Sequence, residues 1–258
     1  MPKFKLGKLA PRKLMSTPAF GDYLDKATTW PVVPAQGWET AVNPSSWGML
    51  GNDQWGDCAI AGIMHLIQAQ SANTGNPLTA TDDQALSLYS AVTGFDPNAG
   101  PSGNNPTDQG TALTDLLTYI QKNGVEMTDA SGKTVTEGIV GFAALDISSI
   151  AQMRYASYTF GGNYLGVNLP QPCEDDTTNW NFAPDLHTVG GHCITRVGEG
   201  AAGGKIVSWG MVIPTSNGFL LGYLDEAYIV ISKSWLNAQG KSPTGLDLNG
   251  LLAAMKVL

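Results

Sequence analysis

The segment that decides the fold reads Leu50-Gly-Asn-Asp-Gln-Trp-Gly-Asp57 and continues as Cys58-Ala-Ile-Ala-Gly-Ile-Met-His-Leu-Ile-Gln-Ala-Gln-Ser-Ala72. The second part is apolar nearly all round and is ended by Asn73-Thr-Gly75, so we predict a buried helix with Asp57 as its N-cap. Cys58 is then the first residue of this helix. A thiol there meets unpaired backbone N–H groups and the positive end of the helix dipole, which lower its pKa. The segment therefore predicts a reactive cysteine at the start of a buried helix.

The composition is that of a foldable globular chain. Its 258 residues carry a net charge of −8, and 43% of them are apolar. A chain of this length buries roughly three quarters of its unfolded surface, so it needs no disulfide or metal to hold a core. The acidic balance lacks the basic stripe that nucleic acids require, and no apolar run is long enough to span a membrane. We expect neither nucleic acid nor membrane as a partner.

Three regions follow from the changes of pattern along the chain. Residues 1–49 form an extended basic arm rich in proline and tryptophan. Residues 50–137 form a helical lobe, with further helices expected at 82–92 and 111–122. Residues 138–258 form a β-rich lobe, with strands expected at 139–145, 164–169, 191–197, 205–209 and 227–232, a short helix at 146–155 and a C-terminal helix at 246–257. This order predicts an α+β protein whose two lobes meet at a cleft.

The N-terminal arm and the cysteines bear on location. Prolines interrupt the arm and no apolar run follows it, so it does not have the pattern of a secretory signal. The three cysteines are an odd count without the density of a disulfide scaffold, which fits a reducing compartment. We therefore expect a cytoplasmic or virion-associated protein.

Two further segments supply groups that could act with the cysteine. They are Gly190-Gly-His-Cys-Ile-Thr-Arg-Val-Gly198 and Val207-Ser-Trp-Gly210. A histidine on a strand of the opposite lobe can pair with a thiolate and later protonate the leaving group. Cys58 and His192 are therefore the candidate catalytic pair.

These segments together resemble the papain-like cysteine peptidases. Gly56-Asp57-Cys58 is similar to the family's Gly-Ser-Cys, and Asn52 stands six residues before the cysteine, where the family has its oxyanion-hole glutamine. His192 follows Cys58 by 134 residues, within the expected window, and Ser208-Trp-Gly210 resembles the motif after the family's orienting asparagine. The resemblance implies a papain-like two-lobe fold, a Cys58–His192 pair, an oxyanion hole at Asn52 and protein or peptide as substrate. The segment from Leu50 to Cys58 is also similar to small papain-like proteins of bacterial and phage genomes.

The chain departs from the family pattern at the residue that orients the histidine. Val207 stands at the position of the orienting asparagine, and its side chain cannot hydrogen-bond an imidazole. The candidate replacements are Ser208, Asn217 and Asp225, of which we favour the two neutral residues because a carboxylate would add another buried charge. Strand alternation argues against Ser208, whose side chain should face away from that of Val207.

A metal site is a competing interpretation of the same region. His187, His192, Cys193, Cys173 and Asp185 are ligand types that lie near one another in the sequence. Their spacing lacks the paired Cys-x2-Cys half-site typical of zinc. We predict no metal and no cofactor.

Two functions from different classes remain open. The first is a thiol hydrolase of peptide or isopeptide amide bonds. The second is a papain-fold module whose catalysis has lapsed and which serves binding or assembly, for example in a phage virion. The basic arm bears on the second, because an ordered arm needs buried area to offset its backbone entropy. We expect Phe4, Leu6, Leu9 and Leu14 to make apolar contacts with the body or with a neighbouring subunit.

Overall fold

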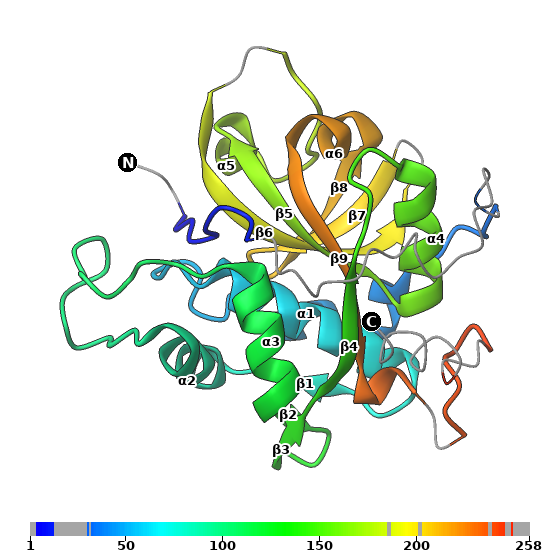
Figure 1. Ribbon diagram of the computed structural model, residues 1–258, viewed down its shortest axis with the longest axis horizontal. Coiled ribbons are helices and arrows are strands. Elements are labelled where there is room, and N and C mark those ends of the chain that lie inside the picture. Colours follow the sequence, from blue (N-terminus) through cyan, green and yellow to red (C-terminus); the bar gives the residue numbers. More distant parts are fainter. Residues whose placement is uncertain are drawn as a thin grey trace.

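The computed structural model describes residues 4–12, 30, 32–184, 187–200, 203–236, 239–245 and 249 (Figure 1). The C-terminal helix expected at 246–257 lies, apart from Asn249, outside the described residues. Within the described residues, no helix combines the length and the apolar character needed to cross a membrane.

The first lobe combines helices with a small sheet. Its elements in chain order are η2 (Trp38–Ala41), η3 (Pro44–Ser46), α1 (Cys58–Asn73), β1 (Leu78–Thr79), α2 (Asp82–Thr93), α3 (Leu113–Asn123), β2 (Val125–Asp129) and β3 (Thr134–Glu137). The three strands pair in the order β1-β2-β3, and both pairs are antiparallel. One apolar cluster joins α1, α2 and α3.

The second lobe is built on a six-stranded antiparallel sheet. Its elements are β4 (Ile139–Ala144), α4 (Ile150–Phe160), β5 (Asn163–Pro170), α5 (Pro172–Asp175), β6 (Thr188–Glu199), β7 (Gly203–Ser208), β8 (Met211–Ser216), α6 (Asn217–Tyr223), β9 (Leu224–Ser232) and η4 (Lys233–Trp235). The strand order is β4-β9-β5-β6-β7-β8. In Figure 1 most of this sheet lies above α1, whereas its edge strand β4 runs down beside α1, and α2 and α3 lie toward the lower left. The α+β class predicted from the sequence is confirmed.

Helix α1 is the central element of the structure. Every residue from Cys58 to Ser71 is buried. Polar side chains of the helix bond to other parts of the structure, as Gln70 does: its Nε2 donates to Phe160 O and Val230 O, each at 2.7 Å. Asp57 stands at the N-cap as expected but makes no capping hydrogen bond, and burial raises the pKa of its carboxyl well above the usual range. The helix starts where the sequence predicts, but the predicted capping by the Asp57 side chain is wrong.

The close approach of α1 to β6 depends on Gly62. A Cβ at this residue would lie 2.7 Å from Cys193 Sγ and 3.2 Å from Tyr164 Cε2. Thr195 Oγ1 donates to Gly62 O at 2.5 Å, and Tyr164 Oη donates to Ala59 O at 2.8 Å. These contacts press the first two turns of α1 against the sheet. They bring the start of the helix to the part of β6 that carries His192.

The sequence did not indicate two parts of this architecture. The turn between β7 and β8 is a two-residue hairpin loop in which Trp209 and Gly210 have φ of 48° and 70°. Such turns favour Asn-Gly or Asp-Gly, so Trp-Gly gave no hairpin signal. The β2–β3 hairpin was also missed, because polar and exposed residues dominate its second strand.

Gly62→Ala should lower the free energy of unfolding by about 1 kcal/mol. Alanine adds about 1 kcal/mol of helix propensity, but overpacking against Cys193 and Tyr164 costs about 1–3 kcal/mol. Urea denaturation followed by circular dichroism measures the change. The control is Gly218→Ala in α6, where the nearest atom to a Cβ is 3.2 Å away, on the exposed Phe182. A Gly62→Ala protein as stable as the wild type would contradict the packing described for α1.

Candidate active site

Cys58 begins α1 with its sulfur fully enclosed. The backbones of Gly7, in the arm, and of Cys193, in β6, lie close enough to the thiol to act on its pKa. Burial raises the pKa of Cys58 to about 11, although both of these backbone groups act to lower it. The expectation of a lowered pKa is therefore wrong for this state of the chain. The thiol is protonated at neutral pH because desolvation outweighs the helix terminus and the backbone groups.

His192 lies in β6, opposite Val167 of β5. Its Nε2 is 2.7 Å from Ser208 Oγ, and its ring stacks on Trp209 with centroids 4.7 Å apart. Its Nδ1 is buried and has no hydrogen-bond partner among the described residues. Burial lowers the pKa of His192 to about 3, so the ring is neutral at pH 7. One ring nitrogen is held by a hydroxyl, and the other is available to a further group.

Strand register explains why Ser208 reaches this ring. Val207 pairs with Thr195 of β6, which puts Ser208 level with Ile194 on the opposite face of the sheet. The side chain of His192, two residues before Ile194, lies on that same face. The Ser208 side chain does face away from that of Val207, as alternation requires. The pairing of β6 with β7, however, places the His192 side chain on the same face of the sheet as Ser208. The argument against Ser208 therefore fails because the sequence did not reveal the register.

The other two candidates for orienting the ring lie elsewhere. Asp225 accepts a hydrogen bond from Lys8 at 2.9 Å. Asn217 is the first residue of α6, and its Oδ1 is buried without a partner in the described part of the chain. Neither forms a described hydrogen bond with His192, which leaves Ser208 as the candidate that contacts the ring.

Asn52, the candidate oxyanion donor, is buried in the turn before α1. Its Nδ2 donates to Trp55 O at 3.1 Å and to Lys5 O, in the arm, at 3.2 Å. The amide that would face an oxyanion thus faces a peptide carbonyl in the described state. This contact places an extended peptide segment beside the predicted oxyanion hole.

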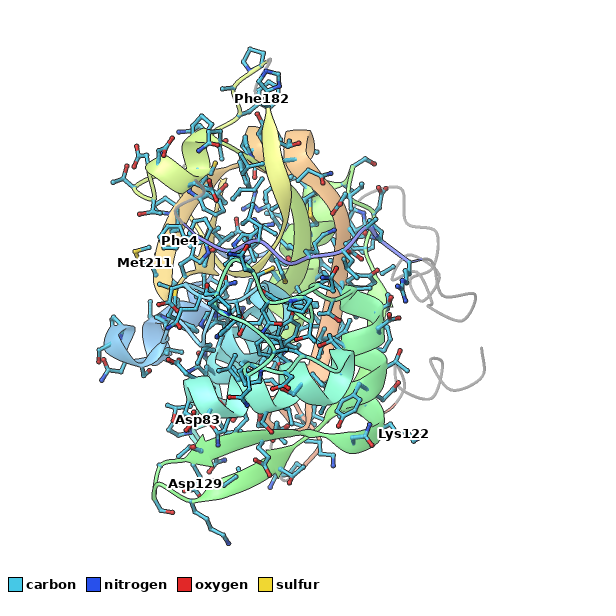
Figure 2. All side chains as sticks on the ribbon, turned by 90° about the vertical axis from the view of Figure 1, so that its left-hand side faces the viewer. Phe4, Asp83, Lys122, Asp129, Phe182 and Met211 are labelled. Carbon is cyan, nitrogen blue, oxygen red and sulfur yellow. The ribbon has the colours of Figure 1, made fainter. Side chains whose placement is uncertain are left out.

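Residues 4–12 of the arm lie across the site. Lys8 N donates to Gly191 O at 3.1 Å, next to His192, and Leu9 N donates to Thr111 O at 3.0 Å. Thr111 N donates in turn to Gly7 O at 2.8 Å, so that Lys8 and Thr111 form a parallel bridge. The arm is therefore bonded to both lobes. Figure 2 shows it crossing the molecule from Phe4, between the large sheet and the helices.

The arm packs closely at its centre. A Cβ on Gly7 would lie 1.7 Å from Gly56 O, so no larger residue fits there without moving the backbone. Phe4 stacks on Trp209 with ring centroids 4.2 Å apart, and Leu6 packs against the core of the second lobe. Leu9 is exposed, contrary to expectation, and Leu14 lies outside the described residues. The arm thus covers the site mainly through Phe4 to Lys8.

Several solved structures share this arrangement of elements. Xylellain, a cysteine protease from Xylella fastidiosa, matches with a TM-score of 0.62 at 11% identity, over 89% of this chain and 96% of xylellain. Procathepsin B S9 from Trypanosoma congolense matches with a TM-score of 0.59 at 10% identity, over 89% and 86% of the two chains. The Carica candamarcensis cysteine protease CMS1MS2, solved in complex with E-64, matches with a TM-score of 0.54 at 14% identity, over 78% and 99%.

The chain has a papain-like fold. No model of a protein family and no curated protein matches the sequence. The likeness therefore lies in the fold, and the predicted papain-like two-lobe architecture is confirmed. The pairing of Cys58 with His192 stays a prediction, because no hydrogen bond between these two described residues is formed. The phage and virion assignments also stay predictions, since none of these matches bears on them.

The competing metal interpretation gains no support from the described residues. Among them, no group of three or more His, Cys, Asp or Glu side chains is placed to hold an ion. Asp185 lies outside the described residues, and His192 is held by Ser208. The residues that sequence analysis overlooked are instead Gly7 and Lys8 of the arm, and Thr111, which pairs with them. The only signal for them in the sequence is the concentration of basic residues near the N-terminus.

The raised pKa of Cys58 predicts an unusual pH profile for alkylation. In the wild-type chain, the rate of iodoacetamide labelling at Cys58 should keep rising from pH 8 toward a midpoint near pH 11, because only the thiolate reacts. Mass spectrometry of the peptide that contains Cys58 measures the rate. A profile with its midpoint near pH 8.5, the pKa of an unperturbed thiol, would contradict the enclosed state.

Gly7→Ala should displace the arm and expose the thiol. The added methyl group cannot fit against Gly56 O, whereas Leu9→Ala alters an exposed side chain and serves as the control. We expect labelling of Cys58 at pH 7.5 to be at least about tenfold faster in Gly7→Ala than in the wild type or in Leu9→Ala. Cys173, labelled in the same sample, should keep its rate. Equal rates at Cys58 in all three proteins would show that the arm does not protect it.

Proposed function

We propose that this protein is a papain-like thiol hydrolase of peptide or isopeptide amide bonds, with Cys58 as nucleophile and His192 as base. In the state described above, its own residues 4–12 block the site. The observation that carries the proposal is the position of the arm. An extended peptide crosses the thiol at the start of α1, and its backbone is bonded to Gly191 O beside His192 and to Thr111 on the other lobe. This surface can therefore hold the main chain of a peptide next to the sulfur.

The chemistry follows from the groups around the thiol. His192 Nδ1, the ring nitrogen not taken by Ser208, accepts the proton of Cys58 Sγ. The sulfur attacks the amide carbon, and the oxyanion that forms receives hydrogen bonds from Asn52 Nδ2 and from the N–H of Cys58, a free donor of the first helical turn. His192 then gives the proton to the leaving amine, which departs and leaves a thioester. Water, deprotonated by His192, attacks the thioester to release the acid and restore the thiol.

Displacement of the arm is the step that makes this chemistry available. Burial raises the pKa of Cys58 to about 11 and lowers that of His192 to about 3, so both groups are uncharged while the arm is in place. Removing the arm admits water to the sulfur and the ring, which reduces the desolvation that holds both groups neutral. The helix terminus can then favour the thiolate. We infer that activity appears only when the arm has left.

The alternative function is a binding module whose catalysis has lapsed. Val207, in place of an orienting asparagine, and the neutral state of both Cys58 and His192 favour it. The two functions differ in one measurable respect. The hydrolase, once its arm is displaced, turns over peptides and reacts with an epoxide probe, whereas the lapsed module does neither.

Hydrolysis of a fluorogenic peptide library by the full-length Gly7→Ala protein tests the proposal. We expect turnover that is abolished by a further Cys58→Ala change. Ser208→Ala should lower kcat by at least about tenfold, because loss of a group that orients the histidine costs up to about four orders of magnitude in a serine triad. Asn217→Ala, which removes a side chain that does not contact the ring, is the matched control. If Gly7→Ala cleaves no peptide and Cys58 fails to react with an epoxide, the lapsed module is the better description.

A further inference from the structure

We propose that Asp225 and Glu226 form a pocket for a basic side chain of the peptide substrate, and that Lys8 of the arm occupies this pocket in the described state. The inference rests on the proposed function and adds a substrate class to it, namely peptides with a lysine or arginine beside the scissile bond. Its support is the environment of the Lys8 side chain.

The ammonium group of Lys8 is buried between two carboxylates. Its Nζ lies 2.9 Å from Asp225 Oδ2 and 3.1 Å from Glu226 Oε1, and it also donates to Leu9 O at 3.0 Å. Only 1% of the side chain is exposed. Lysine is almost never fully buried unless it is paired, because the desolvation of its charge must be offset by close partners. The site therefore supplies what a buried basic side chain requires.

The shape of the pocket depends on a glycine. Gly166 of β5 lies beneath the lysine stem, and a Cβ there would be 2.4 Å from Lys8 Cε and 2.6 Å from Glu226 Cγ. Tyr228 Oη donates to Glu226 Oε2 at 2.9 Å and so fixes the orientation of that carboxylate. The absence of a side chain at Gly166 leaves room for the lysine stem, and the Tyr228 hydroxyl holds the Glu226 carboxylate in position. These features belong to the body of the protein and not to the arm.

The charge of the pocket is unbalanced when it is empty. Both ion pairs described for Asp225 and Glu226 involve Lys8. Departure of the arm would leave two adjacent carboxylates, partly buried, without this cation. Two such carboxylates repel each other and attract a cation that fits between them. A basic side chain of an incoming peptide restores the balance.

The pocket stands at the right place to select a substrate. Lys8 follows Gly7, whose backbone lies close to the Cys58 thiol, and Lys8 N donates to Gly191 O beside His192. A residue that enters the same pocket from an extended backbone thus carries a neighbouring peptide bond close to the thiol. A surface depression of about 320 Å³, bordered by Arg12, Asp225 and Glu226, adjoins the pocket. It leaves room for the larger head group of arginine.

Binding to an inactive form tests the pocket apart from catalysis. The protein is full-length Gly7→Ala with Cys58→Ala, and the probes are fluorescent peptides in which one lysine, arginine or norleucine is moved through an alanine background. Fluorescence polarisation should show at least about tenfold tighter binding of lysine or arginine than of the uncharged norleucine at one position. Adding Asp225→Asn and Glu226→Gln should remove that preference. The control Asp83→Asn with Glu126→Gln removes two exposed acidic charges from the first lobe and should retain it.

Hydrolysis by the Gly7→Ala protein, which keeps Cys58, separates the two proposals. Cleavage that favours lysine or arginine by at least about tenfold at one position, and loses this preference with the Asp225→Asn and Glu226→Gln changes, is the expected result. Cleavage with equal rates for lysine and norleucine peptides would overturn the pocket and leave the hydrolase standing. Selective binding of lysine peptides without any cleavage would overturn the hydrolase and leave the pocket standing. Equal binding of lysine and norleucine peptides at every position would overturn the pocket in either case.

A second readout uses the wild-type arm. Asp225→Asn with Glu226→Gln in the otherwise wild-type chain leaves the Lys8 ammonium buried without its anionic partners, which strongly disfavours the bound arm. Labelling of Cys58 at pH 7.5 should then be faster by at least about tenfold than in the wild type. An unchanged labelling rate would mean that the acidic pair does not hold Lys8 in place, and it would count against the pocket.

Discussion

The contact of α1 with β6 at Gly62 is the constraint on which the rest of the structure depends. A hydrogen atom in place of a side chain lets the helix backbone approach Cys193 and Thr195. The thiol of Cys58, at the helix terminus, thereby meets the backbone of the residue that follows His192. A helix held a few ångströms further away would separate the groups contributed by the two lobes. The geometry of the candidate site is thus a consequence of packing in the core.

Desolvation decides the charge state of this site. A helix terminus stabilises a nearby charge by about 0.3–1 kcal/mol, and by about 2 kcal/mol in favourable geometry. Removing a charge from water costs several kcal/mol, even after relaxation of the protein. The enclosed thiol of Cys58 therefore stays protonated despite its position at the start of α1. Whether the arm covers the sulfur matters more for its reactivity than which element carries it.

The sequence predicted those parts of the fold that local chemistry determines. Helix α2 begins at Asp82, as the sequence predicts, with Thr81 and Gln84 capping it, and α1 begins at Cys58, the residue expected for its start. The sequence could not predict contacts set by register or by long loops. Alternation along its own strand argues against Ser208, although the position of Ser208 opposite β6 decides that it contacts His192. The ion pair between Lys8 and Asp225 joins residues 217 positions apart, and no periodicity or spacing rule reaches that far.

The arm and a peptide substrate would compete for the same surface. The bonds to Gly191 O and Thr111 use only main-chain atoms, so any extended peptide can form them. What distinguishes the arm is Gly7, which fits against Gly56, and Lys8, which fills the acidic pocket. Because the arm belongs to the same chain, its binding is intramolecular and does not depend on protein concentration. A free peptide with the same two features would have to compete with a segment that is always present beside the thiol.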